Sequence, residues 1–160
     1  MAQDQRVTFL NDQAVPSREG VAYWMQASPR TRYNHALEYA IHVANHRATP
    51  LEVFFVLSPD YPGAALRHYW FLVQGLHDVY QGLERRGIPF SVRLGNAPKV
   101  VTAVATRVGT IVTDRGYTAI QRQWRDTVAG QIDCPLVQVE SNVVVPVHTV
   151  SEKQEWSAAT

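Results

Sequence analysis

The chain has 160 residues, of which 46% are hydrophobic and 18% charged, and its formal net charge is +1. This length suits one domain that buries its own core without disulfides or metals, and the composition excludes an intrinsically disordered chain. So small a net charge also excludes the strong basic excess of a protein that binds nucleic acid through phosphate contacts alone.

The single cysteine, Cys134, can form neither an internal disulfide nor a metal-binding cysteine pair. A reducing, cytoplasmic location is therefore expected. The chain has no run of about 18 apolar residues that would predict a membrane-spanning helix, and its amino terminus lacks the residue order of a secretion signal. We expect neither a membrane nor a metal among its partners.

Residues 1–19 are polar and aperiodic, which predicts an extended or disordered arm. After them, short β-rich runs alternate with longer stretches of helical period, the pattern of βα units in a parallel sheet. The predicted strands are 21–25, 51–57, 88–94, 110–113 and 135–139. The predicted helices are 64–86, 97–108, 120–128 and an earlier one with Tyr33, Leu37, Ile41 and Ala44 on its packed face. The sequence thus predicts an α/β domain over 20–147 with a doubly wound, Rossmann-like, five-stranded parallel sheet.

The longest predicted helix, 64–86, carries an apolar stripe. The stripe consists of Leu66, Trp70, Val73, Leu76, Tyr80 and Leu83. Trp24, Trp70 and Trp124 each fall on an apolar face, where a large aromatic side chain usually fills the core. We therefore expect these three residues to be buried rather than to form an electron-transfer chain.

Motifs for other chemistries are missing or incomplete. Glu38, His42 and His46 share a helical face at a spacing that can bind zinc, but no further ligand is clearly placed to complete a tetrahedral site. The chain has no nucleophile elbow, Walker loop or GxGxxG motif. Hydrolase, NTPase and classical dinucleotide-binding functions therefore have no motif to support them.

Several ordered blocks of residues carry more information than composition does. They are Tyr23-Trp24-Met25 with Arg30, Asn34, Ala36 and Leu37; Arg67-His68-Tyr69-Trp70-Phe71 with Gly75-Leu76; Gly87-Ile88-Pro89-Phe90; Thr113-Asp114 with Gln123-Trp124; and Val137-Gln138-Val139-Glu140 with Asn142, Val145-Pro146 and residues 151–156. Together they resemble the amino-terminal domain of class II cyclobutane-pyrimidine-dimer DNA photolyases, over roughly 20–160. Arg115-Gly116-Tyr117 and the final Ala158-Ala159-Thr160 depart from the family pattern.

The resemblance implies one domain of a light-dependent DNA repair enzyme. Such photolyases split pyrimidine dimers in damaged DNA with an electron from reduced FAD, which is held in a following helical domain. Residues 148–160 would begin the linker to that domain, and the chain alone would lack the FAD site and repair activity. The α/β domain supports the helical domain, which should leave an exposed apolar patch on this chain. In some members it also holds a light-harvesting chromophore such as a deazaflavin.

An open parallel sheet binds its ligands at the carboxyl ends of the strands, at the topological switch point. For a planar chromophore, Trp24 and Met25 would offer apolar faces, Asp114 a hydrogen-bonding carboxylate and Arg30 a cation. Asp114 could equally cap the next turn. The predicted chromophore-binding residues are Trp24, Met25, Arg30, Asp114, Glu140 and Asn142.

Two other functions remain open. A free-standing nucleotide-binding or signalling domain, similar to universal stress proteins or electron-transfer flavoprotein subunits, would have the same general design. It should carry a glycine-rich phosphate loop, whereas residues 114–117 supply one glycine. A cryptochrome-like photoreceptor would share this α/β domain, and the residues that distinguish it from a repair enzyme would lie in the following helical domain.

Overall fold

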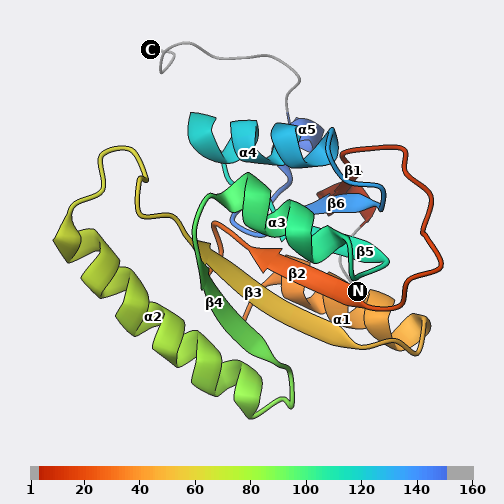
Figure 1. Ribbon diagram of the computed structural model, residues 1–160, viewed down its shortest axis with the longest axis horizontal. Coiled ribbons are helices and arrows are strands. Elements are labelled where there is room, and N and C mark those ends of the chain that lie inside the picture. Colours follow the sequence, from red (N-terminus) through yellow and green to blue (C-terminus); the bar gives the residue numbers. More distant parts are fainter. Residues whose placement is uncertain (1–3, 151–160) are drawn as a thin grey trace.

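The computed structural model describes residues 4–150, which form a six-stranded sheet with helices on both faces (Figure 1). The strands are β1 (Val7–Phe9), β2 (Val21–Met25), β3 (Leu51–Leu57), β4 (Phe90–Leu94), β5 (Thr110–Asp114) and β6 (Leu136–Val139). The helices are the short 3-10 turn η1 (Asp4–Arg6), α1 (His35–His46), α2 (Leu66–Glu84), α3 (Ala97–Ala105), α4 (Ala119–Ala129) and α5 (Val147–Val150).

Strand order across the sheet is β1-β6-β5-β2-β3-β4. From β2, the chain adds β3 and β4 on one side, then crosses back and adds β5 and β6 on the other. These five strands are parallel, so the predicted doubly wound α/β fold is confirmed. The topological switch point lies between β2 and β5, and the carboxyl ends of both strands meet there.

Strand β2 is buried on both faces because its side chains alternate between two cores. Tyr23 and Met25 pack with α1 and the carboxyl half of α2, whereas Ala22 and Trp24 pack with α3 and α4. An apolar run without polar alternation is what a strand covered by helices on both sides requires. This double burial fixes the register of the strand, because a slip by one residue would exchange the two faces.

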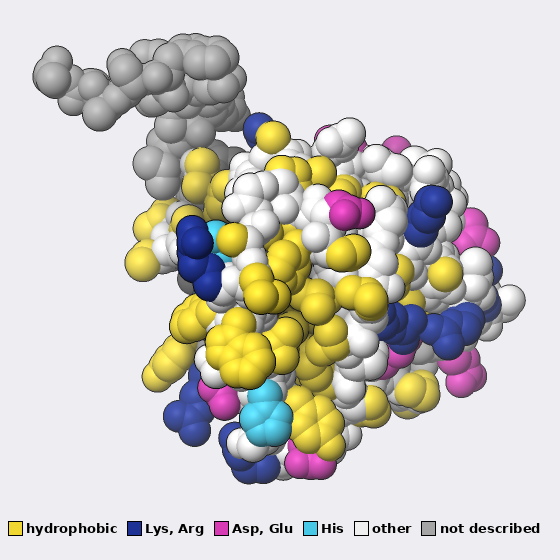
Figure 2. Space-filling model, turned by 60° about the vertical axis from the view of Figure 1, so that its left-hand side comes forward, with side chains coloured by type: hydrophobic (Ala, Val, Ile, Leu, Met, Phe, Trp, Pro, Cys, Tyr) yellow, Lys and Arg dark blue, Asp and Glu magenta, His cyan; other side chains and the backbone are white. Residues whose placement is uncertain are grey.

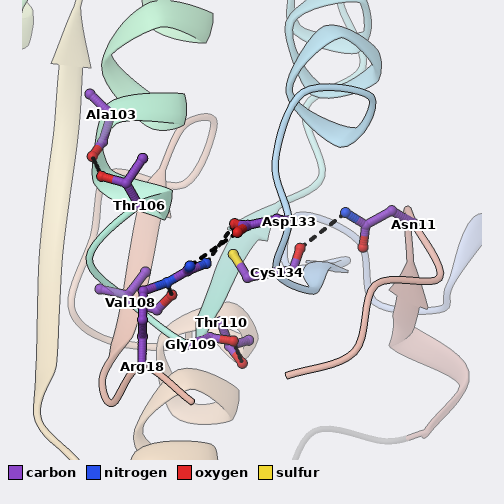
Figure 3. Close-up of polar contacts among 9 residues, drawn as sticks. All are labelled: Asn11, Arg18, Ala103, Thr106, Val108, Gly109, Thr110, Asp133 and Cys134. Carbon is purple, nitrogen blue, oxygen red and sulfur yellow. Dashed lines mark hydrogen bonds and ion pairs between the residues drawn. The ribbon is translucent and has the colours of Figure 1, made fainter. Parts of the chain in front are cut away.

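The predicted count of five strands is wrong by one, because part of the amino-terminal arm pairs as β1. Val7–Phe9 runs antiparallel to β6, with Val7 opposite Val139. The rest of the arm passes the amino-terminal ends of β6 and β5, where Arg18 forms an ion pair with Asp133 and the Asn11 amide donates to the Cys134 carbonyl (Figure 3). A three-residue strand whose partner lies about 130 residues later leaves no local periodicity to detect.

Polar side chains cap the amino-terminal ends of three helices. The side chains of Asn34, Asn96 and Thr118 accept hydrogen bonds from the backbone of the first turns of α1, α3 and α4. Helix α1 therefore starts after Tyr33, contrary to the prediction that Tyr33 packs on its inner face. Tyr33 instead has a φ of 52° and a side chain that is 92% exposed.

Helix α2 is packed along only part of its length. Its buried residues are Leu76, Val79, Gly82 and Leu83, all in the carboxyl half. The prediction that Trp70 fills the core is wrong, since its side chain is 68% exposed. Leu66, Phe71, Val73 and Tyr80 are exposed as well. Hydrophobic side chains gather on the face that includes α2 (Figure 2), so the chain presents an apolar surface there.

Within residues 4–150, no helix combines the length and the apolar character needed to cross a membrane. The predicted linker, 148–160, lies mostly outside the described residues, and its first three residues belong to α5.

Candidate functional site

A cavity of about 230 Å³ opens at the carboxyl ends of β2 and β3. Its walls come from the ends of these strands, the segment that follows β3, the amino-terminal half of α2, and α4. Six of its lining side chains are aromatic: Trp24, Phe55, Tyr61, His68, Tyr69 and Trp124. Among the described residues, no lysine, arginine, aspartate or glutamate lines it. The cavity therefore suits a flat, apolar ring better than a phosphate.

Trp24 and Met25 are the two predicted site residues that line this cavity. Both are almost fully buried at the end of the central strand, so their positions are set by the core. The next residue, Gln26, lines the cavity too, and its side-chain oxygen accepts a hydrogen bond of 2.7 Å from Arg125 of α4. The end of β2 is thereby tied to the helix that forms the opposite wall.

Asp114 lies at the switch point, as the sequence predicts, but it is buried beside the cavity rather than in its lining. Its carboxylate accepts hydrogen bonds from the backbone N–H groups of Gln26 at 2.7 Å and Ala27 at 2.5 Å, and from the Tyr23 hydroxyl at 3.0 Å. Burial raises the pKa of Asp114 and, with the adjacent carboxylate, raises the pKa of Tyr23 well above its usual value. Asp114 fixes the turn that follows β2.

Arg30 and Asn142 bind each other. Arg30 Nη1 donates to Asn142 Oδ1 at 2.7 Å, and Nη2 donates to the Ser141 carbonyl at 2.8 Å. Asn142 Oδ1 also accepts a hydrogen bond from the Ser28 hydroxyl at 2.8 Å. These contacts join the turn after β2 to the end of β6, away from the cavity lining.

Glu140, the last predicted site residue, is buried at the end of β6. It accepts hydrogen bonds from the Tyr117 hydroxyl and from the backbone N–H of Val147, the latter at 3.2 Å, and lies 3.5 Å from Arg115. Burial, together with the hydrogen bond to Glu140, raises the pKa of Tyr117 to about 12. Glu140 thus holds together the loop after β5 and the start of α5.

Arg125 is a buried residue that sequence reasoning missed. Besides Gln26, it binds the carbonyl oxygen of Gly116 at 2.7 Å, and burial lowers its pKa. Its partners lie 99 and 9 residues away, so no local pattern marks them. Tyr61, His68 and Tyr69 were also missed as lining residues, although the block Arg67–Phe71 already singled out two of them.

Glu38, His42 and His46, which share one face of α1, are not placed to hold a metal ion together. The rings of His42 and His46 stack on one another with centroids 6.2 Å apart. Within the described part of the chain, no three histidine, cysteine, aspartate or glutamate residues are placed to hold a metal ion.

The doubly wound sheet defines an α/β domain, and its apolar cavity lies at the carboxyl edge, where ligands of such sheets usually bind. The model of the DNA photolyase family matches residues 21–160. The chain belongs to the DNA photolyase family.

Two relatives illustrate the relationship. The deoxyribodipyrimidine photo-lyase of Methanothermobacter thermautotrophicus is 48% identical over 161 residues, which cover 100% of this chain and 36% of that protein. That of Potorous tridactylus is 37% identical over 157 residues, which cover 94% of this chain and 28% of that protein. The chain therefore spans about a third of the length of these relatives.

Solved structures of similar fold include a photolyase and a universal stress protein. An archaeal photolyase from Sulfolobus tokodaii, described with two FAD molecules, matches 76% of this chain and 29% of its own, with a TM-score of 0.65 and 18% identity. A universal stress protein in complex with cAMP matches 79% of this chain and 100% of its own, with a TM-score of 0.53 and 13% identity. At these identities, both matches show the fold alone.

Proposed function

We propose that this chain is the amino-terminal domain of a class II photolyase that splits cyclobutane pyrimidine dimers in damaged DNA. The order and spacing of the blocks described above support the class II assignment, and the similarity to two deoxyribodipyrimidine photo-lyases supports the reaction. Because the chain spans about a third of those proteins, the helical domain with its FAD would follow residue 160. A cytoplasmic location is in keeping with the buried free thiol of Cys134.

The proposed role of this domain is to hold a light-harvesting chromophore, with a deazaflavin as the candidate. The observation that carries this proposal is the aromatic cavity at the carboxyl edge, where Trp24 and Met25 would contact the ring. Asp114, Arg30, Glu140 and Asn142 would act indirectly, by holding the turns around the cavity.

The chemistry of the cavity lining favours such a ring over a nucleotide. A bound phosphate would need cations or a cluster of free N–H donors, and the lining has no lysine or arginine among the described residues. This disfavours nucleotide binding of the universal-stress type.

The second proposed role is to support the helical domain through the outer face of α2. The amino-terminal half of that helix has no fully buried residue, yet it exposes Leu66, Trp70 and Phe71. Helices in proteins depend mainly on the packing of an apolar face for their stability. Two thirds of each relative lies outside the matched region, and the helical domain within it is the occupant that we assign to this face.

The chromophore role can be tested by titrating the chain with 5-deazaflavin riboside, FAD and ATP and following absorption and fluorescence. We expect saturable binding of the deazaflavin and none of ATP. Gln121→Trp places a large side chain in the cavity and should abolish binding, whereas Gln123→Trp makes the same change on an exposed part of α4 and should leave binding intact. Saturable ATP binding without deazaflavin binding would overturn the proposed role.

A further inference from the structure

The segment between β3 and α2, residues 58–65, contributes Ser58, Tyr61 and Ala64 to the lining of the cavity. Its first residues are firmly held: the Tyr69 hydroxyl lies 2.8 Å from the carbonyl oxygens of both Ser58 and Pro59. The backbone N–H of Tyr61 donates to the same hydroxyl oxygen at 3.3 Å. The Ser58 hydroxyl also donates to the Gly95 carbonyl at 3.1 Å. One end of the segment is thus fixed to α2 and to the loop after β4.

The side chain of Tyr61 extends from this anchored end toward α4, where its contacts are weaker. The Tyr61 ring meets the Trp124 ring edge to face, with centroids 5.8 Å apart and an interplanar angle of 77°. Its hydroxyl lies 3.3 Å from the Thr118 hydroxyl in an exposed position. An exposed hydrogen bond between two hydroxyls competes with water and contributes little net stability. The contacts that hold the Tyr61 ring against Trp124 and Thr118 are therefore weak enough to break.

The segment is loosely packed at Gly63. Gly63 has a φ of 75°, and no atom lies within 4 Å of the position that a Cβ would take there. Tyr61 lines the cavity together with Trp124, so lifting its ring would enlarge the cavity on the side of α4. A cavity of about 230 Å³ is smaller than most ligand sites, which measure roughly 300–1,000 Å³.

We propose that Tyr61 is a ligand-contacting gate: its ring, which packs edge to face on Trp124, lifts to admit a planar chromophore and then packs against the bound ring. The inference rests on the proposed chromophore role and adds to it the residue that controls exchange. Loops that close over sites in this way usually move on a microsecond to millisecond timescale. Binding should therefore depend on Tyr61 through its rates as well as its affinity.

The test is stopped-flow fluorescence of the chain mixed with 5-deazaflavin riboside. Tyr61→Ala removes the contacts with Trp124 and Thr118 and should raise the association rate by roughly tenfold. The dissociation rate should rise by more than that, because packing against the bound ring is lost as well. Tyr61→Phe keeps the ring and loses the contact with Thr118, so both rates should rise by only about twofold to threefold. Tyr33→Ala is the matched control, because Tyr33 is an exposed tyrosine that does not line the cavity.

Each outcome decides between the two proposals. If wild type binds the probe and Tyr61→Ala leaves both rates unchanged, or raises dissociation alone, Tyr61 is not a gate and the chromophore role stands. If Tyr61→Ala binds and wild type does not, the gate is confirmed in a closed form. If neither protein binds the probe, the gate and the chromophore role are both overturned.

Discussion

The two halves of α2 have similar apolar sequences and opposite surroundings. In the carboxyl half, Leu76, Val79 and Leu83 are buried against the sheet and α1. In the amino-terminal half, Leu66 is 84% exposed and Phe71 is 79% exposed, while His68 and Leu72 line the cavity on the other side of the helix. One half therefore anchors the helix, and the other carries a wall of the proposed site and the surface offered to the helical domain.

This difference shows what an apolar helical period does and does not reveal. The period correctly indicates a helix, because both halves repeat with helical spacing. It does not indicate which apolar side chains reach the core of this domain, since a surface for another domain has the same pattern. Paired substitutions in the two halves can test this division.

The largest expected contrast is between the same substitution at the two ends of α2. Leu83→Ala removes a fully buried side chain and should lower the free energy of unfolding by about 2–5 kcal/mol. Leu66→Ala changes an exposed side chain and should stay within about 0.5 kcal/mol of wild type. Urea denaturation followed by circular dichroism measures both. Equal losses would mean that Leu66 packs as tightly as Leu83, contrary to the division proposed.

The two glycines of α2 should respond to alanine with opposite signs. A Cβ at Gly75 would meet nothing within 4 Å, so Gly75→Ala should stabilise the helix by about 0.5–1 kcal/mol through backbone entropy alone. A Cβ at Gly82 would lie 2.6 Å from Thr31 Oγ1 and 2.9 Å from Thr31 Cγ2. Gly82→Ala should therefore cost roughly 1–3 kcal/mol in denaturation experiments.

Thr31→Ala provides the check on this pair. It removes the two closest atoms, so the loss caused by Gly82→Ala should be smaller in that background, while the gain from Gly75→Ala should be unchanged. A stabilising Gly82→Ala in the wild-type background would show that the carboxyl half is packed more loosely than described here.

The exposed aromatic residues of the amino-terminal half should govern association rather than folding. Replacing Trp70 and Phe71 with serine should change the free energy of unfolding by no more than about 1 kcal/mol, because both side chains are exposed. It should reduce concentration-dependent self-association in sedimentation velocity, since large exposed apolar patches favour association. Arg67→Ser, at an exposed polar position in the same turn, is the control. Unchanged self-association would argue against an interaction surface.

Much of this architecture could be predicted from the sequence, but only where the information is local. Alternating βα periods predicted the parallel sheet, and the end of β5 correctly placed Asp114 at the switch point. Strand β1 could not be predicted, because three residues are too few to show the alternation of apolar and polar side chains that indicates a strand. The hydrogen bond between Arg30 and Asn142 could not be predicted, because these residues are 112 positions apart in the sequence. Contacts between residues about 100 positions apart, such as Gln26 with Arg125, depend on the assembled fold.

The smallest expected effect is a pH dependence confined to the carboxyl half of α2. The Tyr80 hydroxyl donates to Glu84 Oε1 at 2.8 Å, and this hydrogen bond raises the pKa of Tyr80. A raised pKa in the folded state stabilises the fold below the unfolded value of about 10, and that stability is lost as pH rises through the folded value. The stability difference between wild type and Tyr80→Phe should therefore be constant below about pH 10 and shrink above it.

Unfolding of wild type, Tyr80→Phe and Glu84→Gln between about pH 8 and pH 11.5 would measure this dependence. Comparison between variants cancels the titration of Tyr23 and Tyr117, whose pKa values are also raised. Glu84→Gln removes the charge that holds the phenol proton, so it should lose most of the pH dependence that wild type shows relative to Tyr80→Phe. If that dependence survives in Glu84→Gln, it arises from another group, and the Tyr80–Glu84 pair adds nothing to the anchoring of this half of the helix.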